Sequence, residues 1–137
     1  MSTAPIYLDT SAVLRAWLET GTSPEVEARL LAAPALVTSR LALVESARVM
    51  HRVRSLGALA EARLADAERG IEEVWARCDV WELTREVCDL ARTLAPSRPL
   101  RALDALHLAT FVVARRRIEG LEMLTTDGRL AEVSGLV

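Results

Sequence analysis

Four acidic residues lie at positions where their side chains could act together in catalysis. Asp9 directly follows a short apolar run, and Asp127 follows another run that ends in two threonines. Glu45 falls in the second turn of a predicted helix, and Asp104 falls in the first turn of another. If the apolar runs are neighbouring parallel strands, all four carboxylates converge at the edge where these strands end.

Carboxylates placed this close together indicate a particular chemistry. They repel one another unless a cation neutralises them. Oxygen ligands without cysteine or histidine favour Mg²⁺ or Mn²⁺ over Zn²⁺. The hydroxyls that flank the acids could hold a water beside such an ion; they belong to Thr10, Ser11, Thr125 and Thr126. The pattern therefore predicts metal-assisted hydrolysis of a phosphodiester bond.

Each acid also has a purely structural interpretation. Aspartate is common where a strand turns into a helix, so Asp9 and Asp127 could be caps or turn residues. Glu45 could lie on a solvated helix face. Asp104 belongs to a helix that is apolar nearly all round, so its carboxylate needs a partner, which a nearby arginine could provide. The two arginines in question are Arg98 and Arg101.

The elements that must position these acids alternate between strand and helix. Strands are expected at 6–8, 35–38, 79–83 and 122–125, with a further edge strand at 136–137. Helices are expected at 10–19, 24–32, 39–55, 58–77 and 84–95, then from 100 or 102 to 118, and after Asp127. Thr10 or Ser11 could cap the first helix, Gly21 ends it, Ser23 precedes the second, and Gly70 is a weak point in the fourth. The alternation favours one domain, residues 1–137, with helices on both faces of a parallel sheet.

The composition excludes several other classes of protein. The chain has 137 residues, of which 51% are hydrophobic and 26% charged, as in one folded domain. All 17 basic residues are arginine, so enzymes that need a lysine ammonium group are excluded, among them P-loop NTPases and Schiff-base enzymes. A net charge of −2 excludes a polycation that coats nucleic acid. Cys78 and Cys88 fit neither a disulfide framework nor a zinc spacing, which indicates free thiols in a reducing compartment.

No segment indicates export or membrane insertion. Residues 1–5 contain neither a basic region nor an apolar core, so we expect no signal peptide. The least polar stretch, 102–114, is interrupted by Asp104 and His107 and is too short to span a bilayer. We therefore expect a soluble cytoplasmic protein that makes no contact with a membrane.

Four segments resemble the motifs of the PIN-domain nuclease family, in the family's order and spacing. They are Asp-Thr-Ser at 9–11, Thr-Ser-Arg-Leu-Ala-Leu-Val-Glu at 38–45, Leu-Asp-Ala-Leu-His-Leu-Ala at 103–109 and Leu-Thr-Thr-Asp-Gly-Arg-Leu at 124–130. The resemblance covers nearly the whole chain. The length also suits the small bacterial members of the family, the VapC-type toxins of toxin–antitoxin pairs.

This resemblance implies an α/β/α sandwich around a central parallel sheet of four to five short strands. It also implies cleavage of RNA that depends on Mg²⁺ or Mn²⁺, a homodimer, and inhibition by a cognate VapB-type antitoxin. Asp9, Glu45 and Asp104 match the family's core metal-binding acids, and Asp127 matches the fourth, more variable one. The hydroxyl partner of this site is then one of the two neighbouring threonines, Thr125 or Thr126.

Several other residues allow both a functional and a structural interpretation. His107 could donate a proton, but we expect a packed or hydrogen-bonded histidine. Arg48 and Arg52 share a helix stripe with Glu45 and could contact RNA phosphates or lie on a solvated face. The arginines at 115–117 suit a helix C-terminus. Trp17 could help to form an antitoxin groove, although packing in the core is the default.

Two other functions fit parts of the sequence. One is a PIN-like module that binds RNA or a protein without cutting it, although the presence of all four acids argues against a decayed site. The other is a phosphatase or receiver-like domain with Asp9 as the nucleophile, which the absence of lysine disfavours.

Overall fold

The computed structural model describes residues 4–19 and 24–137. Its elements are β1 (Ile6–Leu8), α1 (Thr10–Leu18), α2 (Pro24–Ala32), β2 (Leu36–Ser39), α3 (Arg40–Leu56), α4 (Glu61–Arg77), β3 (Cys78–Trp81), α5 (Arg85–Ala91), α6 (Ala102–Arg115), β4 (Glu122–Leu124) and α7 (Gly128–Ser134). The roles predicted for Gly21 and Ser23 lie outside the described residues.

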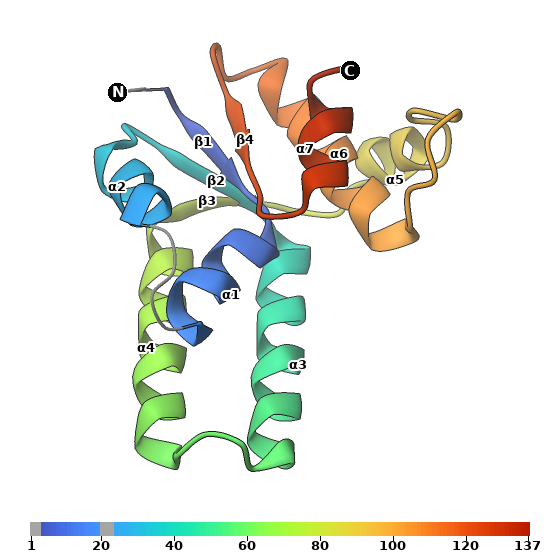
Figure 1. Cartoon of the computed structure of the whole chain (residues 1–137). Coiled ribbons are helices and arrows are strands. Elements are labelled where there is room, and N and C mark those ends of the chain that lie inside the picture. Colours follow the sequence, from blue (N-terminus) through green and yellow to red (C-terminus); the bar gives the residue numbers. More distant parts are fainter. Residues whose placement is uncertain (1–3, 20–23) are drawn as a thin grey trace.

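The strands form one parallel sheet in the order β3-β2-β1-β4. At the centre of the sheet, Ile6 of β1 pairs with Leu36 of β2 on one side and with Glu122 of β4 on the other. Parallel neighbours need crossover connections, and the helices provide them. In Figure 1, α1, α3 and α4 lie below the sheet, whereas α5, α6 and α7 lie to its right. The expected α/β/α sandwich is confirmed.

Side chains of β1 alternate between two hydrophobic cores. Ile6 and Leu8 pack in a first core with residues of α1, α2, α3 and α4. Tyr7 points to the other face and packs in a second core with α6 and α7. Burial on both faces explains why this strand is uniformly apolar. A fully buried leucine such as Leu8 contributes about 1.5–3 kcal/mol to stability.

Several predicted elements differ from the structure in their bounds: the helix expected from 58 begins at Glu61, and the helix expected to end at 118 ends at Arg115. Two others differ more. The edge strand expected at 136–137 was wrong, because the Leu136 N–H donates to the Val133 carbonyl at 2.9 Å and the chain is still in the turn that ends α7. The helix expected over 84–95 ends at Ala91, and Ala95 then adopts a left-handed conformation with φ 47°. No described helix is both long and apolar enough to cross a membrane.

Candidate active site

The four predicted acids lie where strands end and helices begin. Asp9 separates β1 from α1, Glu45 lies in the second turn of α3, Asp104 lies in the first turn of α6, and Asp127 is the N-cap of α7. In Figure 1, β1, β2 and β4 end close together, where α1, α3 and α7 start. The charges of the other three acids all act on Asp104. We call this set of four carboxylates the acidic site.

Asp9 is held by two hydroxyls. Ser11 and Thr125 donate to its Oδ2 atom at 2.6 and 2.8 Å. Asp9 itself is the N-cap residue of α1, but its side chain makes no capping hydrogen bond. Thr10 is already helical and the Ser11 hydroxyl binds Asp9, so the prediction that Thr10 or Ser11 caps this helix was wrong. Asp9 is only 6% exposed, and its side chain is held in place without capping the helix.

Glu45 is tied to its surroundings through one oxygen. Its Oε1 atom accepts a hydrogen bond from the Thr10 hydroxyl at 2.7 Å and lies 2.6 Å from Nε2 of His107. Burial acts to raise the pKa of the Glu45 carboxyl, but the hydrogen bonds from His107 and Thr10 outweigh it and leave the pKa below its usual range. Glu45 is therefore an anchored carboxylate and not a freely solvated one.

No arginine forms an ion pair with Asp104 in the described part of the chain. Arg98 pairs instead with a glutamate of α7, and Arg101 is exposed and forms no ion pair there. Burial raises the pKa of the Asp104 carboxyl, and the carboxylates of Asp127 and Asp9 raise it further. The arginine pairing that a structural interpretation requires is thus not found among the described residues, and the pKa of Asp104 stays raised although His107 acts to lower it.

Asp127 does cap a helix, as the alternative interpretation predicted. Its Oδ1 atom accepts hydrogen bonds from the backbone N–H groups of Arg129 and Leu130 at 2.9 and 3.2 Å. The cap uses Oδ1 alone, so it leaves the second carboxylate oxygen available for another role.

The two threonines before Asp127 take different positions. The Thr125 hydroxyl donates to Asp9 and accepts from the Asp127 N–H at 3.0 Å. Thr126 instead reaches the site through its backbone, whose N–H donates to the Ser11 hydroxyl at 3.2 Å. The structure thus links Asp9 and Asp127 through the Thr125 side chain.

The donor atoms of the acidic site suit a hard divalent cation. They are carboxylate and hydroxyl oxygens, the ligands that Mg²⁺ and Mn²⁺ prefer. Across residues 4–19 and 24–137, no three aspartate, glutamate, histidine or cysteine side chains lie close enough together to bind a metal ion as they stand. A cation bound between the carboxylates would remove the repulsion that raises the pKa of Asp104. Charge and donor type therefore both fit such an ion.

Three arginine side chains that form no ion pair within the described residues lie on α3 or at the start of α6, the helices that carry Glu45 and Asp104. Arg48 and Arg52 line a hollow of about 420 Å³ on the exposed side of α3, together with His51 and Ser55. Neither arginine side chain forms an ion pair or hydrogen bond within the described residues, and the same holds for the side chain of Arg101, the N-cap residue of α6. The sequence predicted Arg48 and Arg52 as possible RNA contacts, whereas it offered Arg101 only as a possible partner of Asp104.

The arginines at 115–117 are engaged elsewhere. Arg115 binds the Val137 carbonyl, Arg116 pairs with Glu86 at 3.6 Å, and the Arg117 guanidinium lies 5.7 Å from the Trp81 ring centre. These contacts fit the structural role that the sequence predicted for them.

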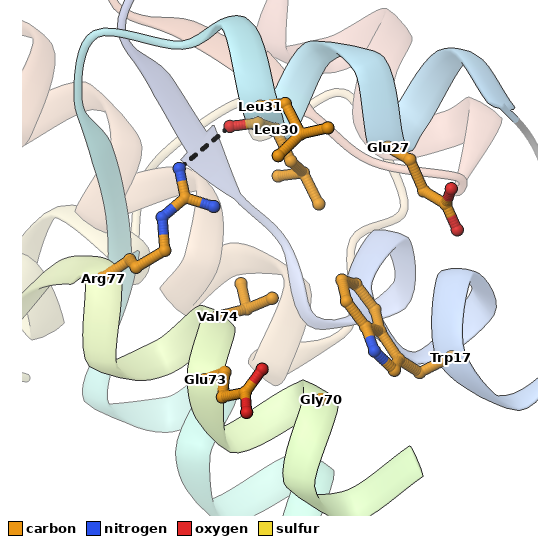
Figure 2. Close-up of a pocket in the computed structure, with 8 residues that line it drawn as sticks. All are labelled: Trp17, Glu27, Leu30, Leu31, Gly70, Glu73, Val74 and Arg77. Atoms are coloured by element: carbon orange, nitrogen blue, oxygen red, sulfur yellow. Dashed lines mark hydrogen bonds between the residues drawn. The ribbon is translucent and has the colours of Figure 1, made fainter. Parts of the chain in front are cut away.

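A second concave region lies between α1, α2 and α4. Figure 2 shows the Trp17 indole beside Gly70 of α4, with Leu30 and Leu31 of α2 across the cavity. The cavity has a volume of about 270 Å³, and Leu31 beside it is 80% exposed. We call this region the apolar groove. Its remaining lining residues are Val74, Glu27, Glu73 and Arg77.

Gly70 sets the shape of this groove. A Cβ atom at this position would lie 1.8 Å from Nε1 of Trp17. The indole, which also packs against the first core, therefore depends on a glycine here. The predicted weak point lies within the unbroken helix α4, and the absent side chain is what lets α1 approach it.

Sequence reasoning missed how His107 connects the acids. The prediction of a hydrogen-bonded histidine is confirmed, since the side chain is 1% exposed and bonded through both ring nitrogens. Its Nε2 atom lies 2.6 Å from Oε1 of Glu45 and 3.7 Å from Oδ1 of Asp9. The spacing from Asp104 placed His107 near the site, but it could not show that a side chain of α3 would meet it.

Comparison with known proteins identifies the family. The family model of the PIN domain matches residues 6–136. Two curated proteins of Mycobacterium tuberculosis, ribonuclease VapC45 (strain CDC 1551) and ribonuclease VapC49 (strain H37Rv), are each 37% identical to this chain over 126 residues. The match covers 91% of this chain and 85% of each relative.

Solved structures show the same fold. PAE2754 from Pyrobaculum aerophilum matches with a TM-score of 0.64 at 20% identity, over 96% of this chain and 80% of that one. A toxin–antitoxin complex from Klebsiella pneumoniae matches with a TM-score of 0.63 at 18% identity, over 89% of this chain and 86% of that one. Mycobacterium tuberculosis VapC20, described as a sarcin–ricin-loop-cleaving toxin, matches with a TM-score of 0.61 at 18% identity, over 93% of each chain. From the family match and the two VapC relatives, we conclude that this chain belongs to the PIN-domain family, among its VapC-type nucleases.

Proposed function

We propose that this protein is a metal-dependent endoribonuclease and the toxin of a VapBC-type toxin–antitoxin pair. Asp9, Glu45, Asp104 and Asp127 would hold Mg²⁺ or Mn²⁺. The observation that carries the proposal is that the charges of the other three acids act on Asp104, which forms no ion pair with an arginine among the described residues. The names of the VapC45 and VapC49 relatives, both ribonucleases, support the same activity.

A divalent ion at this site would neutralise charge on the scissile phosphate and lower the pKa of an attacking water. The side chains around it have separate tasks. Ser11 and Thr125 fix Asp9 by binding Oδ2, which leaves Oδ1 free of both hydroxyls. Thr10 and His107 bind Oε1 of Glu45, so that Oε2 is available.

The unpaired arginines would bind the RNA backbone. Arg48 and Arg52 follow Glu45 along α3 at about 4.5 and 10.5 Å of helix rise, distances that suit successive phosphates. A guanidinium binds a phosphate through two parallel N–H groups. Arg101 would add a contact from the start of α6. These residues position the substrate and carry no base specificity.

The apolar groove is where we place the cognate antitoxin. Trp17, Leu30 and Leu31 offer an apolar surface that an amphipathic helix could cover. The neighbour from Klebsiella pneumoniae is a toxin–antitoxin complex, which supports a partner of this kind. We also propose a homodimer, which sedimentation of the purified protein would test. A monomer at micromolar concentration would contradict it.

An RNA cleavage assay tests the proposed activity. We expect wild type to cut an RNA pool in Mn²⁺ or Mg²⁺ and EDTA to stop it. Asp9→Asn and Asp104→Asn should each reduce the rate by at least about 100-fold, because each removes a metal-binding charge. Asp66→Asn, which changes an exposed acid of α4 paired with Arg69, is the matched control and should cut normally. Cleavage that survives EDTA and both site substitutions would overturn the metal mechanism.

A further inference from the structure

His107 lies buried between two acids of the acidic site, Asp9 and Glu45. It is on α6, one turn after Asp104, and its side chain is 1% exposed. Nε2 contacts Oε1 of Glu45 at 2.6 Å, and Nδ1 contacts the Tyr7 hydroxyl at 2.8 Å. The ring thus joins a residue of β1 to a residue of α3.

The hydrogen atoms of this chain of contacts can be assigned from its donors and acceptors. The Glu45 carboxylate can only accept, so Nε2 of His107 must carry the hydrogen and donate it. In a neutral ring Nδ1 is then an acceptor, and the Tyr7 O–H donates to it. Each atom has one role, and no buried side-chain nitrogen or oxygen in the described residues lacks a partner. The Glu45 carboxylate therefore fixes a hydrogen on Nε2, and the Tyr7 hydroxyl holds the other ring nitrogen.

The same nitrogen also lies near Asp9, with 3.7 Å between Nε2 and Oδ1. The Thr10 hydroxyl, which donates to Oε1 of Glu45, lies 3.2 Å from this nitrogen. Rotation of the Glu45 side chain would break two hydrogen bonds at once. The distance between the carboxylates of Asp9 and Glu45 is thus set by a buried N–H donor.

We propose that His107 is a positioning residue, which holds Glu45 at its working distance from Asp9 for binding a divalent cation, with Tyr7 fixing the orientation of its ring. The inference rests on the proposed metal-dependent function. A histidine that only packs makes a different prediction, since it could be replaced by an apolar side chain. A histidine that supplies the N–H donor to Glu45 could be replaced by glutamine but not by leucine.

Four variants separate these roles. His107→Gln places an amide N–H where Nε2–H stands, and His107→Leu fills the space without a donor. Tyr7→Phe keeps the ring but removes the hydroxyl. Phe111→Leu is the control for packing, since Phe111 is buried on α6 and its ring lies edge-on to Tyr7 at 5.9 Å. Thermal unfolding without metal shows which variants are folded.

Binding of Mn²⁺, followed by calorimetry, is the readout besides cleavage. We expect His107→Leu to weaken Mn²⁺ binding by about 10- to 100-fold, as for other residues that orient metal ligands. His107→Gln should restore most of the affinity, Tyr7→Phe should lose less than His107→Leu, and Phe111→Leu should bind as wild type. Wild-type affinity in His107→Leu, or equal losses in the leucine and glutamine variants, would overturn the positioning role alone. Wild type that binds no Mn²⁺ would overturn the proposed function, and this inference with it.

Discussion

The acidic site and the apolar groove are built in opposite ways. In the acidic site, side chains from four separate helices and their preceding loops are joined by short polar contacts, such as that from Thr125 to Asp9 at 2.8 Å. In the apolar groove, the Trp17 indole lies against the bare backbone of Gly70, and no polar bond between the two defines its shape. One region depends on charge and hydrogen bonding, and the other on how closely two helices approach.

This difference determines what a substitution can do in each region. The carboxylates of the acidic site repel one another, so a substitution there can remove activity without loss of stability. The groove belongs to the first core, so a substitution there affects packing before it affects a partner. The two regions should therefore be separable by experiment.

The largest effect is expected for Asp104→Asn. RNA cleavage should fall by at least about 100-fold, because a proposed metal ligand is lost. The unfolding temperature of the metal-free protein should not fall, because the substitution removes a half-buried charge that the neighbouring acids oppose. Differential scanning calorimetry and an RNA cleavage assay on one preparation test both. A large loss of stability would show that Asp104 is structural, contrary to our account.

Thr125→Val should have the next largest effect. It removes the hydroxyl that holds Oδ2 of Asp9, and we expect a loss of about 10-fold or more in the cleavage rate. Thr126→Val is the matched control, since Thr126 contributes a backbone N–H that the substitution keeps. Equal rates for the two valine variants would refute the assignment of Thr125.

Gly70→Ala tests the groove. Alanine favours the helix by about 1 kcal/mol, but the clash with the indole costs about 1–3 kcal/mol. We expect a net loss of up to about 2 kcal/mol in the free energy of unfolding, a change in Trp fluorescence, and unchanged RNA cleavage. Glu72→Ala, at an exposed position on the same helix, is the control, and its free energy of unfolding should not fall below that of wild type. If Gly70→Ala, like that control, showed no loss in the free energy of unfolding, the close packing of Trp17 against Gly70 would be contradicted.

The smallest effect concerns the two thiols. Burial raises the pKa of the Cys78 thiol to about 12, and this side chain packs against the core that also supports the groove. Cys78 should therefore stay protonated and unreactive at pH 8, while the exposed Cys88 reacts with a disulfide reagent. Unfolding should return the Cys78 pKa to its usual range and make it reactive. If both thiols reacted with the reagent at equal rates in the native protein, the burial of Cys78 would be contradicted.

The sequence predicted the acidic site better than it predicted the groove, for a physical reason. Asp9 and Asp127 follow apolar strands directly, and the ends of parallel strands meet at one edge of the sheet. Local order along the chain therefore indicated their proximity. Thr125 and Thr126 could not be told apart in this way, because backbone direction in the loop after β4 decides which hydroxyl reaches Asp9.

Long-range contacts account for what the sequence could not predict. His107 meets Glu45 only because α6 and α3 pack against the same end of the sheet, and no spacing in either helix shows this. Gly70 was predicted as a weak point in its helix because the Trp17 side chain that occupies its space lies far away in the sequence. The edge strand expected at 136–137 was wrong because the turn after α7 takes up those residues.

Titration of the metal-free protein with Mn²⁺, monitored by the electron paramagnetic resonance of the free ion, tests the central claim most directly. The account predicts saturable binding in wild type, weaker by at least about 100-fold in both Asp9→Asn and Asp104→Asn. Asp66→Asn should bind as wild type. Binding of equal strength in all four proteins, or none in wild type, would contradict the claim that these carboxylates act together to hold a divalent cation.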